Sequence, residues 1–424
     1  MIKREFSQSL KMSGLLIPAI VLISCVACNN NSERSIKTGT DSVVTIRINP
    51  GEARSELINL SYIADRIEYI PLQTNDSIVM GTYLDFHITD DLIFIRDQNC
   101  ILEFDKNGRF IRKMFTVGNG PEESIARSFA VNESERVVYA FDIHSRKGNI
   151  YDFDGRFIST FNKKLCDPNY WINNIAYFRS NIFLSIPVRP GTDYLYSCFD
   201  LRNDSITILH QNPNVFTVSQ ENQAPMIVPS SNSYQVTDSN ILFKDMYCDT
   251  VFITNKEFRT KPCYIIELGS EKLQWEDFRD HGMFDISSGP PNGYYVESFA
   301  DTKSYLLLFV QSFKWPELLC IYDKKTGELA ISSNREYKTA DQQVLMKNDL
   351  DHMTSFPPMS KGDGKFYYHD ECLYSIIEAN EFVDIYRSAA PEVLNSTDYL
   401  RRMKTLFAQM DEFSNPVIMK IHLK

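Results

Sequence analysis

The chain has 424 residues, a formal net charge of −11 at pH 7, and 43% hydrophobic and 23% charged side chains. These fractions are ordinary for a folded globular protein and exclude a disordered, collagen-like or coiled-coil chain. The acidic balance and the lack of a basic run argue against nucleic-acid binding, because such a surface needs basic side chains to displace counterions.

The first 24 residues have the pattern of a secretory signal peptide. Lys3, Arg4 and Lys11 precede a small or apolar run over residues 14–23. A helix of ten residues rises only about 15 Å, about half of a bilayer core, so this run is too short to span a membrane. A basic start followed by a short apolar run is typical of a signal peptide.

At the end of the signal peptide, residues 22–25 read Leu-Ile-Ser-Cys, which has the pattern of a bacterial lipobox. It predicts lipidation of Cys25 and a membrane contact through this N-terminal lipid anchor. Cys28 is an alternative site, although Cys25 then stands where an aliphatic residue is expected, and an ordinary secreted protein is another alternative. We expect a cell-envelope protein anchored in the outer membrane, with the periplasmic or surface side left open.

Residues 25–41 are polar and have the composition of a flexible tether. We therefore divide the chain into a signal peptide over 1–24, a lipidated tether over 25–41 and a folded domain over 42–424. Beyond Cys28, the seven remaining cysteines contain no C-x-x-C motif, and an odd number cannot all pair internally. We assign no disulfide pair, and the spacing gives no support for a zinc site.

Strand signals fill the domain, and one of them repeats. Residues 104–111 and 151–158 are close copies, offset by 47 residues, in which an apolar strand meets Asn-Gly or Asp-Gly and another apolar strand follows. These dipeptides tolerate the positive φ angles of tight hairpin turns. A looser third copy lies at 321–329.

Each hairpin belongs to a longer unit of several strands, and six such units follow one another. Their first apolar runs begin near Leu92, Val137, Ile182, Ile241, Tyr305 and Phe366. The intervals of about 45 to 64 residues fit a four-stranded propeller blade with its loops. We predict an all-β fold, a six-bladed β-propeller of four-stranded antiparallel blades; a pair of β-sandwiches is the alternative.

The ends of the domain are also predicted strands, at 43–48 and 416–423. A propeller whose first and last strands complete one blade has no exposed edge there, so we expect these two segments to pair.

One short C-terminal helix is predicted just before the closing strand. Ser396 or Thr397 can cap it, and Leu400, Met403, Leu406, Phe407 and Met410 recur at helical spacing. A second, shorter helix is predicted at about 339–347.

With these features the chain resembles the six-bladed, NHL-like β-propeller lipoproteins of Bacteroides and its relatives, a largely uncharacterised family. The matching segments are 67–74, 104–108, 117–123, 241–244, 248–252, 348–351 and 415–418. The resemblance covers most of the mature chain. It implies the propeller fold and an envelope lipoprotein, and it implies no defined activity.

Few residues point to chemistry. Asp349, Asp351 and His352 form a candidate metal cluster, although acidic side chains also cap turns and the spacing is not that of an EF-hand. The chain lacks Gly-x-Ser-x-Gly and His-Glu-x-x-His. We assign no catalytic residue and no cofactor.

Aromatic residues are the other candidates. Tyr294 and Tyr295 follow Gly-Pro-Pro-Asn-Gly at 289–293, which is too rich in Gly and Pro for a central strand. Together with Trp275 and Trp315 they are candidate stacking platforms on one loop face. The alternative is that they pack between the blades.

The sequence therefore favours a cell-envelope lipoprotein whose propeller loop face binds a glycan, peptide or protein partner without catalysis. The alternative is a metal-dependent lactonase, lyase or hydrolase with its site at the mouth of the central channel, an analogy made at the level of the fold. A third hypothesis is an accessory subunit of an outer-membrane complex.

Overall fold

The computed structural model describes residues 43–75, 78–81, 83–142, 147–161, 172–188, 191–215, 232–276, 292–333, 346–353 and 366–424. Residues 43–424 form one compact unit. The predicted signal peptide, Cys25, Cys28 and the tether over 25–41 lie outside the described residues. No helix in the described part of the chain is long and apolar enough to span a membrane.

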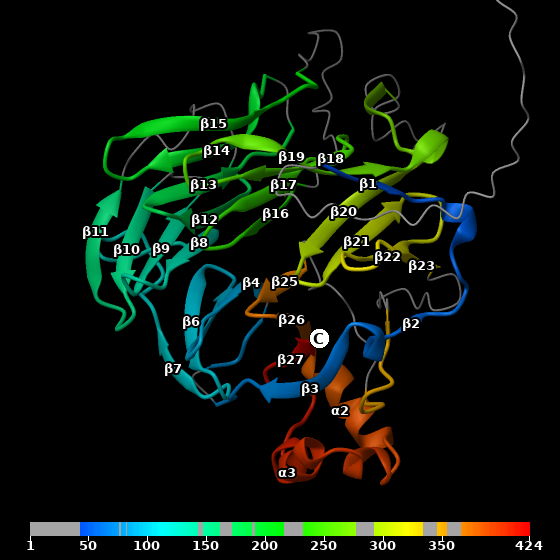
Figure 1. Cartoon of the computed structure of the whole chain (residues 1–424). Helices are drawn as coiled ribbons and strands as arrows, with labels where there is room; N and C mark the ends of the chain where they lie inside the picture. Colours follow the sequence, from blue (N-terminus) through cyan, green and yellow to red (C-terminus); the bar gives the residue numbers. More distant parts are fainter. Residues whose placement is uncertain are drawn as a thin grey trace, which may run out of the picture. The chain divides into compact units, whose positions relative to one another are not determined.

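The described strands confirm a six-bladed β-propeller (Figure 1). Blade 1 consists of β4 (Tyr83–Ile88), β5 (Leu92–Asp97), β6 (Cys100–Asp105) and β7 (Phe110–Lys113). Blade 2 consists of β8 (Ser128–Asn132), β9 (Val137–Asp142), β10 (Lys147–Asp152) and β11 (Phe157–Phe161). Blade 3 consists of β12 (Asn174–Phe178), β13 (Asn181–Ser185), β14 (Tyr194–Asp200) and β15 (Ser205–Gln211).

The second half of the ring has the same order of strands. Blade 4 consists of β16 (Ser233–Val236), β17 (Ile241–Lys244), β18 (Thr250–Thr254) and β19 (Thr260–Glu267). Blade 5 consists of β20 (Tyr294–Asp301), β21 (Tyr305–Ser312), β22 (Leu318–Asp323) and β23 (Leu329–Ser333). Blade 6 consists of β25 (Tyr367–His369), β26 (Cys372–Ile377), β27 (Val417–Leu423) and β3 (Ala64–Pro71).

Five of the six predicted unit starts fall at the beginning of the second strand of a blade. Leu92, Val137, Ile241 and Tyr305 are the first residues of their strands, and Ile182 is the second residue of β13. The sixth start, near Phe366, marks the first strand of its blade instead. The strongest apolar runs are second strands because these strands have a neighbouring strand on each side and a neighbouring blade on each face.

The repeated hairpins join the third and fourth strands of blades 1, 2 and 5. Their glycines, Gly108, Gly155 and Gly327, adopt φ angles of 80°, 75° and 75°. In five blades an Asp or Asn at the end of the third strand accepts backbone N–H groups of the turn. These residues are Asp105, Asp152, Asp200, Asn255 and Asp323. The repeat in the sequence is therefore a turn capped by a side chain.

Blade 6 closes the ring, but not with the predicted pair of strands. Its outer strand is β3, which pairs antiparallel with β27 and sets Tyr69 opposite Met419. The expectation that 43–48 completes this blade is wrong. β1 (Val44–Arg47) instead pairs in parallel with β19 and becomes a fifth strand of blade 4. There Ile46 and Ile48 bury their side chains in the cluster between blades 4 and 5.

The segment between β1 and β3 follows the outer edges of the blades (blue in Figure 1). After η1 (Pro50–Glu52), Arg54 donates its backbone N–H to Ile331 O at 3.0 Å and accepts from Ser333 N at 2.8 Å, which covers β23. The short strand β2 (Ile58–Asn59) then pairs in parallel with β24 (Met346–Lys347), and η2 (Leu60–Tyr62) leads into β3. The N-terminal segment thus covers blades 4 and 5 before completing blade 6.

Two α-helices lie between β26 and β27, so the prediction of one helix is incomplete. The predicted helix is α3 (Asp398–Phe407), where Thr397 Oγ1 accepts a hydrogen bond from Leu400 N. The additional helix is α2 (Ala379–Ser388), which buries Phe382 and Val383. No capping side chain marks its start, since Glu378 makes no cap hydrogen bond.

The remaining short elements are two 3-10 helices, η3 (Gly269–Glu271) after β19 and η4 (Val393–Asn395) between the α-helices. Of the helix predicted at 339–347, residues 339–345 lie outside the described part and Met346–Lys347 form strand β24. Six described cysteines are free, namely Cys100, Cys198, Cys248, Cys263, Cys320 and Cys372.

The hydrophobic core is divided among the six spaces between neighbouring blades. On β21, Leu307 and Phe309 pack toward blade 6, whereas Leu306 and Leu308 pack toward blade 4. Both faces of the strand are buried, which explains an apolar run without polar alternation. The rigid stack of blades fixes the positions of the loops at its two ends.

A buried carboxylate between blades 1 and 2 predicts a dependence of stability on pH. Glu103 is buried on β6, and its Oε2 lies 3.0 Å from Arg112 Nε. Burial raises the pKa of Glu103 from 4.5 to about 7, although the charge of Arg112 opposes this shift. Between these values the folded state holds a proton that the unfolded chain releases, so the free energy of unfolding falls as the pH rises through this window.

We expect Glu103 to lower the free energy of unfolding by roughly 2–4 kcal/mol between about pH 4.5 and about pH 8. Urea titrations of the wild type and Glu103→Gln at both pH values measure this, because the variant should lose that part of the pH dependence. Equal pH dependence in the two proteins would show that Glu103 titrates normally.

Candidate functional site

The propeller has two different ends. Because the four strands of a blade alternate in direction, one end carries the connections between second and third strands and those between blades. We call this end the connection face. In blades 4 and 5 it includes the end of β17, the start of β18, the end of β19, the start of β20 and the end of β21.

All four aromatic residues predicted as binding candidates lie on the connection face. Trp275 follows the end of β19, Tyr294 and Tyr295 begin β20, and Trp315 follows β21. The backbone joins two of these segments, since Leu273 N donates to Tyr294 O at 2.8 Å. Trp275, Tyr294 and Tyr295 also belong to the buried clusters between blades, as the alternative from the sequence expects, and their role in binding stays a prediction.

The structure adds two aromatic residues to this group, Tyr247 and Phe313. The rings form three pairs with centroids 5.1 Å apart for Tyr247–Trp275, 5.6 Å for Tyr295–Phe313 and 5.1 Å for Tyr294–Trp315. We call these six residues the aromatic cluster. The sequence analysis did not single out Tyr247 and Phe313. Both lie within three residues after the end of the second strand of their blade, and this position is a signal that could have found them.

Most of the aromatic cluster is buried, and two of its members reach the surface. Tyr247, Trp275, Tyr294 and Tyr295 are buried, Trp315 is partly exposed, and Phe313 is 37% exposed. The Tyr295 hydroxyl donates to Gln311 Oε1 at 2.9 Å. The buried rings therefore support an exposed edge that Phe313 and Trp315 supply.

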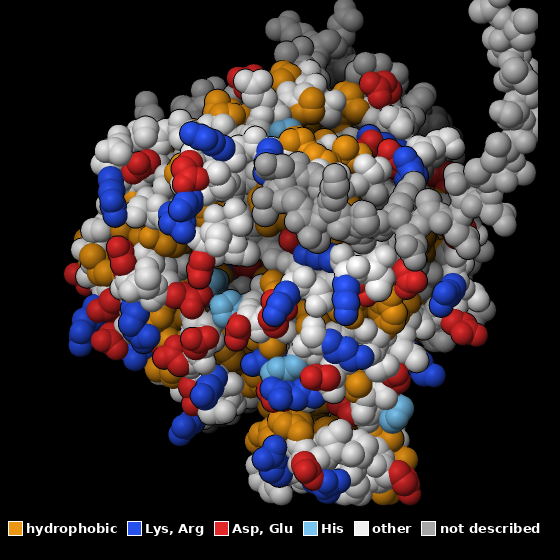
Figure 2. Space-filling model, in the orientation of Figure 1, with side chains coloured by type: hydrophobic (Ala, Val, Ile, Leu, Met, Phe, Trp, Pro, Cys, Tyr) orange, Lys and Arg blue, Asp and Glu red, His pale blue; other side chains and the backbone are white. Residues whose placement is uncertain are grey.

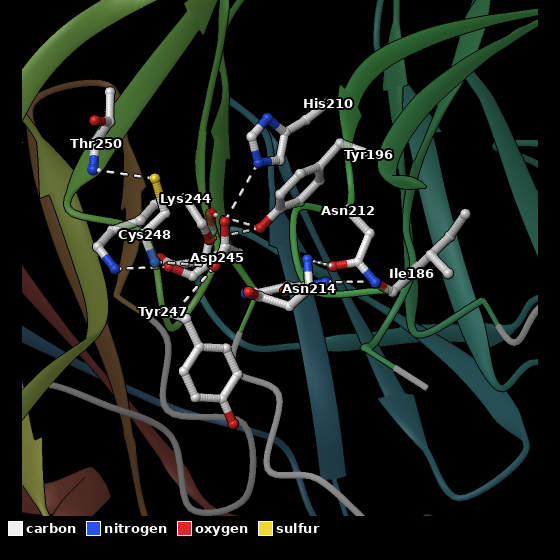
Figure 3. A network of polar contacts seen from close by, with 12 residues as sticks. Ile186, Tyr196, His210, Asn212, Asn214, Lys244, Asp245, Tyr247, Cys248 and Thr250 are labelled. Atoms are coloured by element: carbon white, nitrogen blue, oxygen red, sulfur yellow. Dashed lines mark hydrogen bonds and ion pairs between the residues drawn. The ribbon is translucent and has the colours of Figure 1, made fainter. Parts of the chain in front are cut away.

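A buried polar network holds the connection of blade 4 that carries Tyr247 (Figure 3). Asp245 Oδ1 accepts from the backbone N–H groups of Tyr247 and Cys248 at 2.9 and 3.0 Å. On its other side, Asp245 Oδ2 lies 3.3 Å from His210 Nε2 at the end of β15. Asp245 therefore ties this connection to blade 3, and the Tyr247 ring extends away from the network.

Two further groups complete the network. Lys244 Nζ donates to Asp245 O at 2.7 Å, and the Tyr196 hydroxyl donates to Lys244 O at 2.6 Å. Burial lowers the pKa of Lys244, which the charge of Asp245 opposes. Burial by itself would raise the pKa of Asp245, but the hydrogen bond from His210 and the charge of Lys244 bring it below its usual range. These groups satisfy one another's hydrogen-bonding needs and charges, and they fix the conformation of the connection that carries Tyr247.

An ion pair links the two segments that carry Tyr247 and Trp275. Lys272 Nζ lies 2.9 Å from Asp249 Oδ1, and both side chains are only partly exposed. Figure 2 shows acidic and basic side chains mixed over the viewed surface, without a large area of one sign. An exposed aromatic edge suits a ligand that is recognised by stacking and hydrogen bonds.

The candidate metal residues lie near blade 6, where the structure separates their side chains into different contacts. Asp351 Oδ1 accepts from the Tyr69 hydroxyl at 3.2 Å and from Asn348 Nδ2 at 2.6 Å. Asp349 Oδ2 accepts from Ser61 Oγ at 2.6 Å. His352 adopts a φ of 60°. In the described part of the chain, no three His, Cys, Asp or Glu side chains are grouped to hold a metal.

Six antiparallel blades of four strands, one of them extended by β1, define a protein of the β-propeller class. The chain belongs to the family described as a domain of unknown function, DUF4934, whose model matches residues 43–422.

Two solved structures are similar to this chain. A protein of Bacteroides fragilis described as exported is 13% identical, with 90% of this chain and 100% of that chain covered at a TM-score of 0.62. A member of the DUF4221 family from Bacteroides vulgatus is 11% identical, with 87% and 98% covered at a TM-score of 0.49. A comparison with curated proteins finds no match.

Proposed function

We propose that this protein is a lipid-anchored protein of the cell envelope whose connection face binds a glycan, peptide or protein partner without catalysing a reaction. The aromatic cluster is the single observation that carries the binding proposal. Three pairs of aromatic rings lie at this end of blades 4 and 5, in the clusters on either side of blade 4, and Phe313 and Trp315 are their exposed members. Aromatic rings offer a large apolar area and stack on flat or apolar ligand surfaces.

The scaffold under the cluster supports a rigid binding surface. The buried contacts of Asp245 and the Lys272–Asp249 ion pair hold the neighbouring loop segments in place. A surface that is ordered before binding loses less conformational entropy when the ligand arrives. Loops on a rigid frame are the usual location of binding residues.

The lipobox at residues 22–25 supports the envelope location, as does the fold shared with an exported protein of Bacteroides fragilis. Lipidation of Cys25 would leave residues 26–41 as a tether, and a segment of this length spans at most about 58 Å when fully extended. Such a tether lets the connection face meet ligands beyond the membrane surface.

The binding proposal is tested on glycan and peptide arrays with the full chain purified in detergent. We expect the wild type to bind a defined set of spots and the double variant Phe313→Ala/Trp315→Ala to lose them. Phe413→Ala is the matched control, because Phe413 is 75% exposed but belongs to the segment between α3 and β27. Spots that the double variant and the wild type bind equally would place binding elsewhere, and a wild type without ligands would contradict the proposal.

A further inference from the structure

The outer edges of the six blades are not protected equally. β1 covers the edge of blade 4, and Arg54 covers that of blade 5. On blade 6 the Tyr399 hydroxyl accepts from Tyr69 N at 2.9 Å and donates to Tyr69 O. Among the described residues, no strand pairs with the outer edges of β7, β11 and β15.

Of these three open edges, β15 is the longest and the least protected. Its seven residues, Ser-Ile-Thr-Ile-Leu-His-Gln at 205–211, include no Lys, Arg, Asp, Glu, Gly or Pro. Ile206 and Ile208 are 39% and 49% exposed. By contrast, β7 has four residues and ends in Arg112 and Lys113, and β11 has five residues.

Natural edge strands are usually short, charged, interrupted by proline or covered, because unpaired N–H and C=O groups otherwise recruit another strand. β15 is seven residues long, uncharged and without proline, and no described strand covers it. Its pairing with β14 shifts register between Tyr196–His210 and Ser197–Ile208, which leaves Leu209 as a bulge near its end. The adjacent blade shows that an outer edge of this propeller accepts an added strand, since β1 extends β19 over four residue pairs.

We propose that the edge of β15 pairs with β15 of a second copy of this chain and forms a two-fold symmetric dimer. A two-fold contact brings the same patch of both copies together, so the strand must be compatible with itself. Antiparallel pairing around Ile208 places Ile208 beside Ile208 of the other copy. No like charges face each other across this pair, which removes the usual penalty of self-pairing.

The flanking residues fit the same arrangement. Antiparallel self-pairing brings the charged turn at 200–204, before β15, toward the segment at 212–215 of the other copy. That segment, Asn-Pro-Asn-Val, carries no charge, and Val215 is exposed. Charged residues of one copy therefore do not meet charged residues of the other at the ends of the strand.

The dimer contact uses the outer rim of blade 3 and not the aromatic cluster of blades 4 and 5. Both copies keep their connection faces open, so a dimer presents two binding faces. When a ligand carries several copies of the recognised group, the two linked faces of a dimer can bind it together, which raises the overall affinity without new contacts. The dimer itself does not depend on the proposed binding function.

The test is the protein mass of the full chain in detergent, measured by light scattering with the detergent contribution subtracted, from about 1 to 100 µM. We expect the wild type to reach twice the chain mass and Ile208→Lys to remain monomeric, because a lysine at the centre of the pair sets two like charges opposite each other. Ile206→Lys is a second variant of the same edge. Ile158→Lys is the matched control, because Ile158 is 51% exposed on the open edge of blade 2.

Ile158→Lys should dimerise like the wild type. A monomeric wild type over the whole concentration range would overturn the proposal. It would also be overturned if both β15 variants stayed dimeric, or if only Ile158→Lys became monomeric, because the contact would then lie elsewhere. Unfolding temperatures of all variants should match that of the wild type, since the substituted side chains are exposed.

Discussion

Replacing Tyr69 by alanine is expected to destabilise the propeller by about 3–5 kcal/mol, because a fully buried aromatic side chain leaves a cavity when it is removed. Tyr69 lies on β3, the strand that closes the ring, and its ring packs against Phe382 and Phe407 of the two helices. Its hydroxyl donates to Asp351, so the substitution also leaves a buried carboxylate without one donor. The strand that closes the ring, the helices α2 and α3, and the segment at 348–353 therefore all depend on the Tyr69 side chain.

Chemical denaturation of the wild type and the variant measures this loss. Tyr69→Phe separates the two contributions, because it keeps the ring and removes only the hydrogen bond, with an expected cost of about 1–3 kcal/mol. Tyr62→Ala is the control, and it should cost less than Tyr69→Ala because the Tyr62 side chain lies at the surface and is 38% exposed. Similar losses in Tyr62→Ala and Tyr69→Ala would contradict the closure described above.

Replacing Cys25 by serine is expected to move nearly all of the protein from the membrane fraction to the soluble fraction. The Cys25 thiol is the proposed acylation site, and a serine hydroxyl cannot take its place. Each buried CH₂ of an acyl chain contributes about 0.8 kcal/mol, so several chains hold a protein firmly, whereas a chain without them has no other anchor in this proposal. Fractionation and labelling with a radioactive fatty acid measure the change.

Cys28→Ser is the matched control, because it removes the competing cysteine and leaves residues 22–25 intact. We expect it to remain labelled and membrane-bound. The opposite pattern, with loss of label only in Cys28→Ser, would move the anchor to Cys28. Unchanged labelling in both single variants would contradict the lipobox assignment.

The sequence predicts the blades well because propeller geometry appears as local patterns. Asp105 and Asp152 lie at equivalent turn positions, and the Asn-Gly and Asp-Gly pairs provide the positive φ angles that the turns need. The second strands appear as apolar runs because blades bury both of their faces. Each of these signals lies within about ten residues, which sequence reading captures.

The elements that the sequence did not predict correctly depend on contacts between residues that are distant in the chain. β1 and β3 are both apolar strands near the start of the domain, and only their partners distinguish them. Val44 faces Tyr264, whereas Tyr69 faces Met419. Helix α2 lacks a capping side chain, and its apolar residues gain their partner only from the fold.

The candidate site was predicted in part for the same reason. Four of the six aromatic residues stood out in the sequence. Tyr294 and Tyr295 follow a segment rich in Gly and Pro, and Trp275 and Trp315 belong to a residue type that is rare in this chain. Tyr247 and Phe313 did not, because many Tyr and Phe residues fill the spaces between blades. Only the pairing of segments from blades 4 and 5 shows that these two rings join the others.

The metal candidates show that closeness in sequence does not bring side chains to one point. Asp349 and Asp351 are close in sequence, yet their carboxylates bond to Ser61 and to Tyr69 on either side of the chain. Metal binding by Asp349, Asp351 and His352 stays a prediction, and elemental analysis of protein purified without chelator tests it.

The central claim is that the connection face of blades 4 and 5 binds the ligand. Its most direct test is an equilibrium titration by calorimetry, in which a ligand found on the arrays is added to the full chain. The account predicts that Phe313→Ala/Trp315→Ala weakens binding at least about tenfold, or about 1.4 kcal/mol, while Phe413→Ala binds like the wild type. Equal affinity of the double variant and the wild type would contradict it.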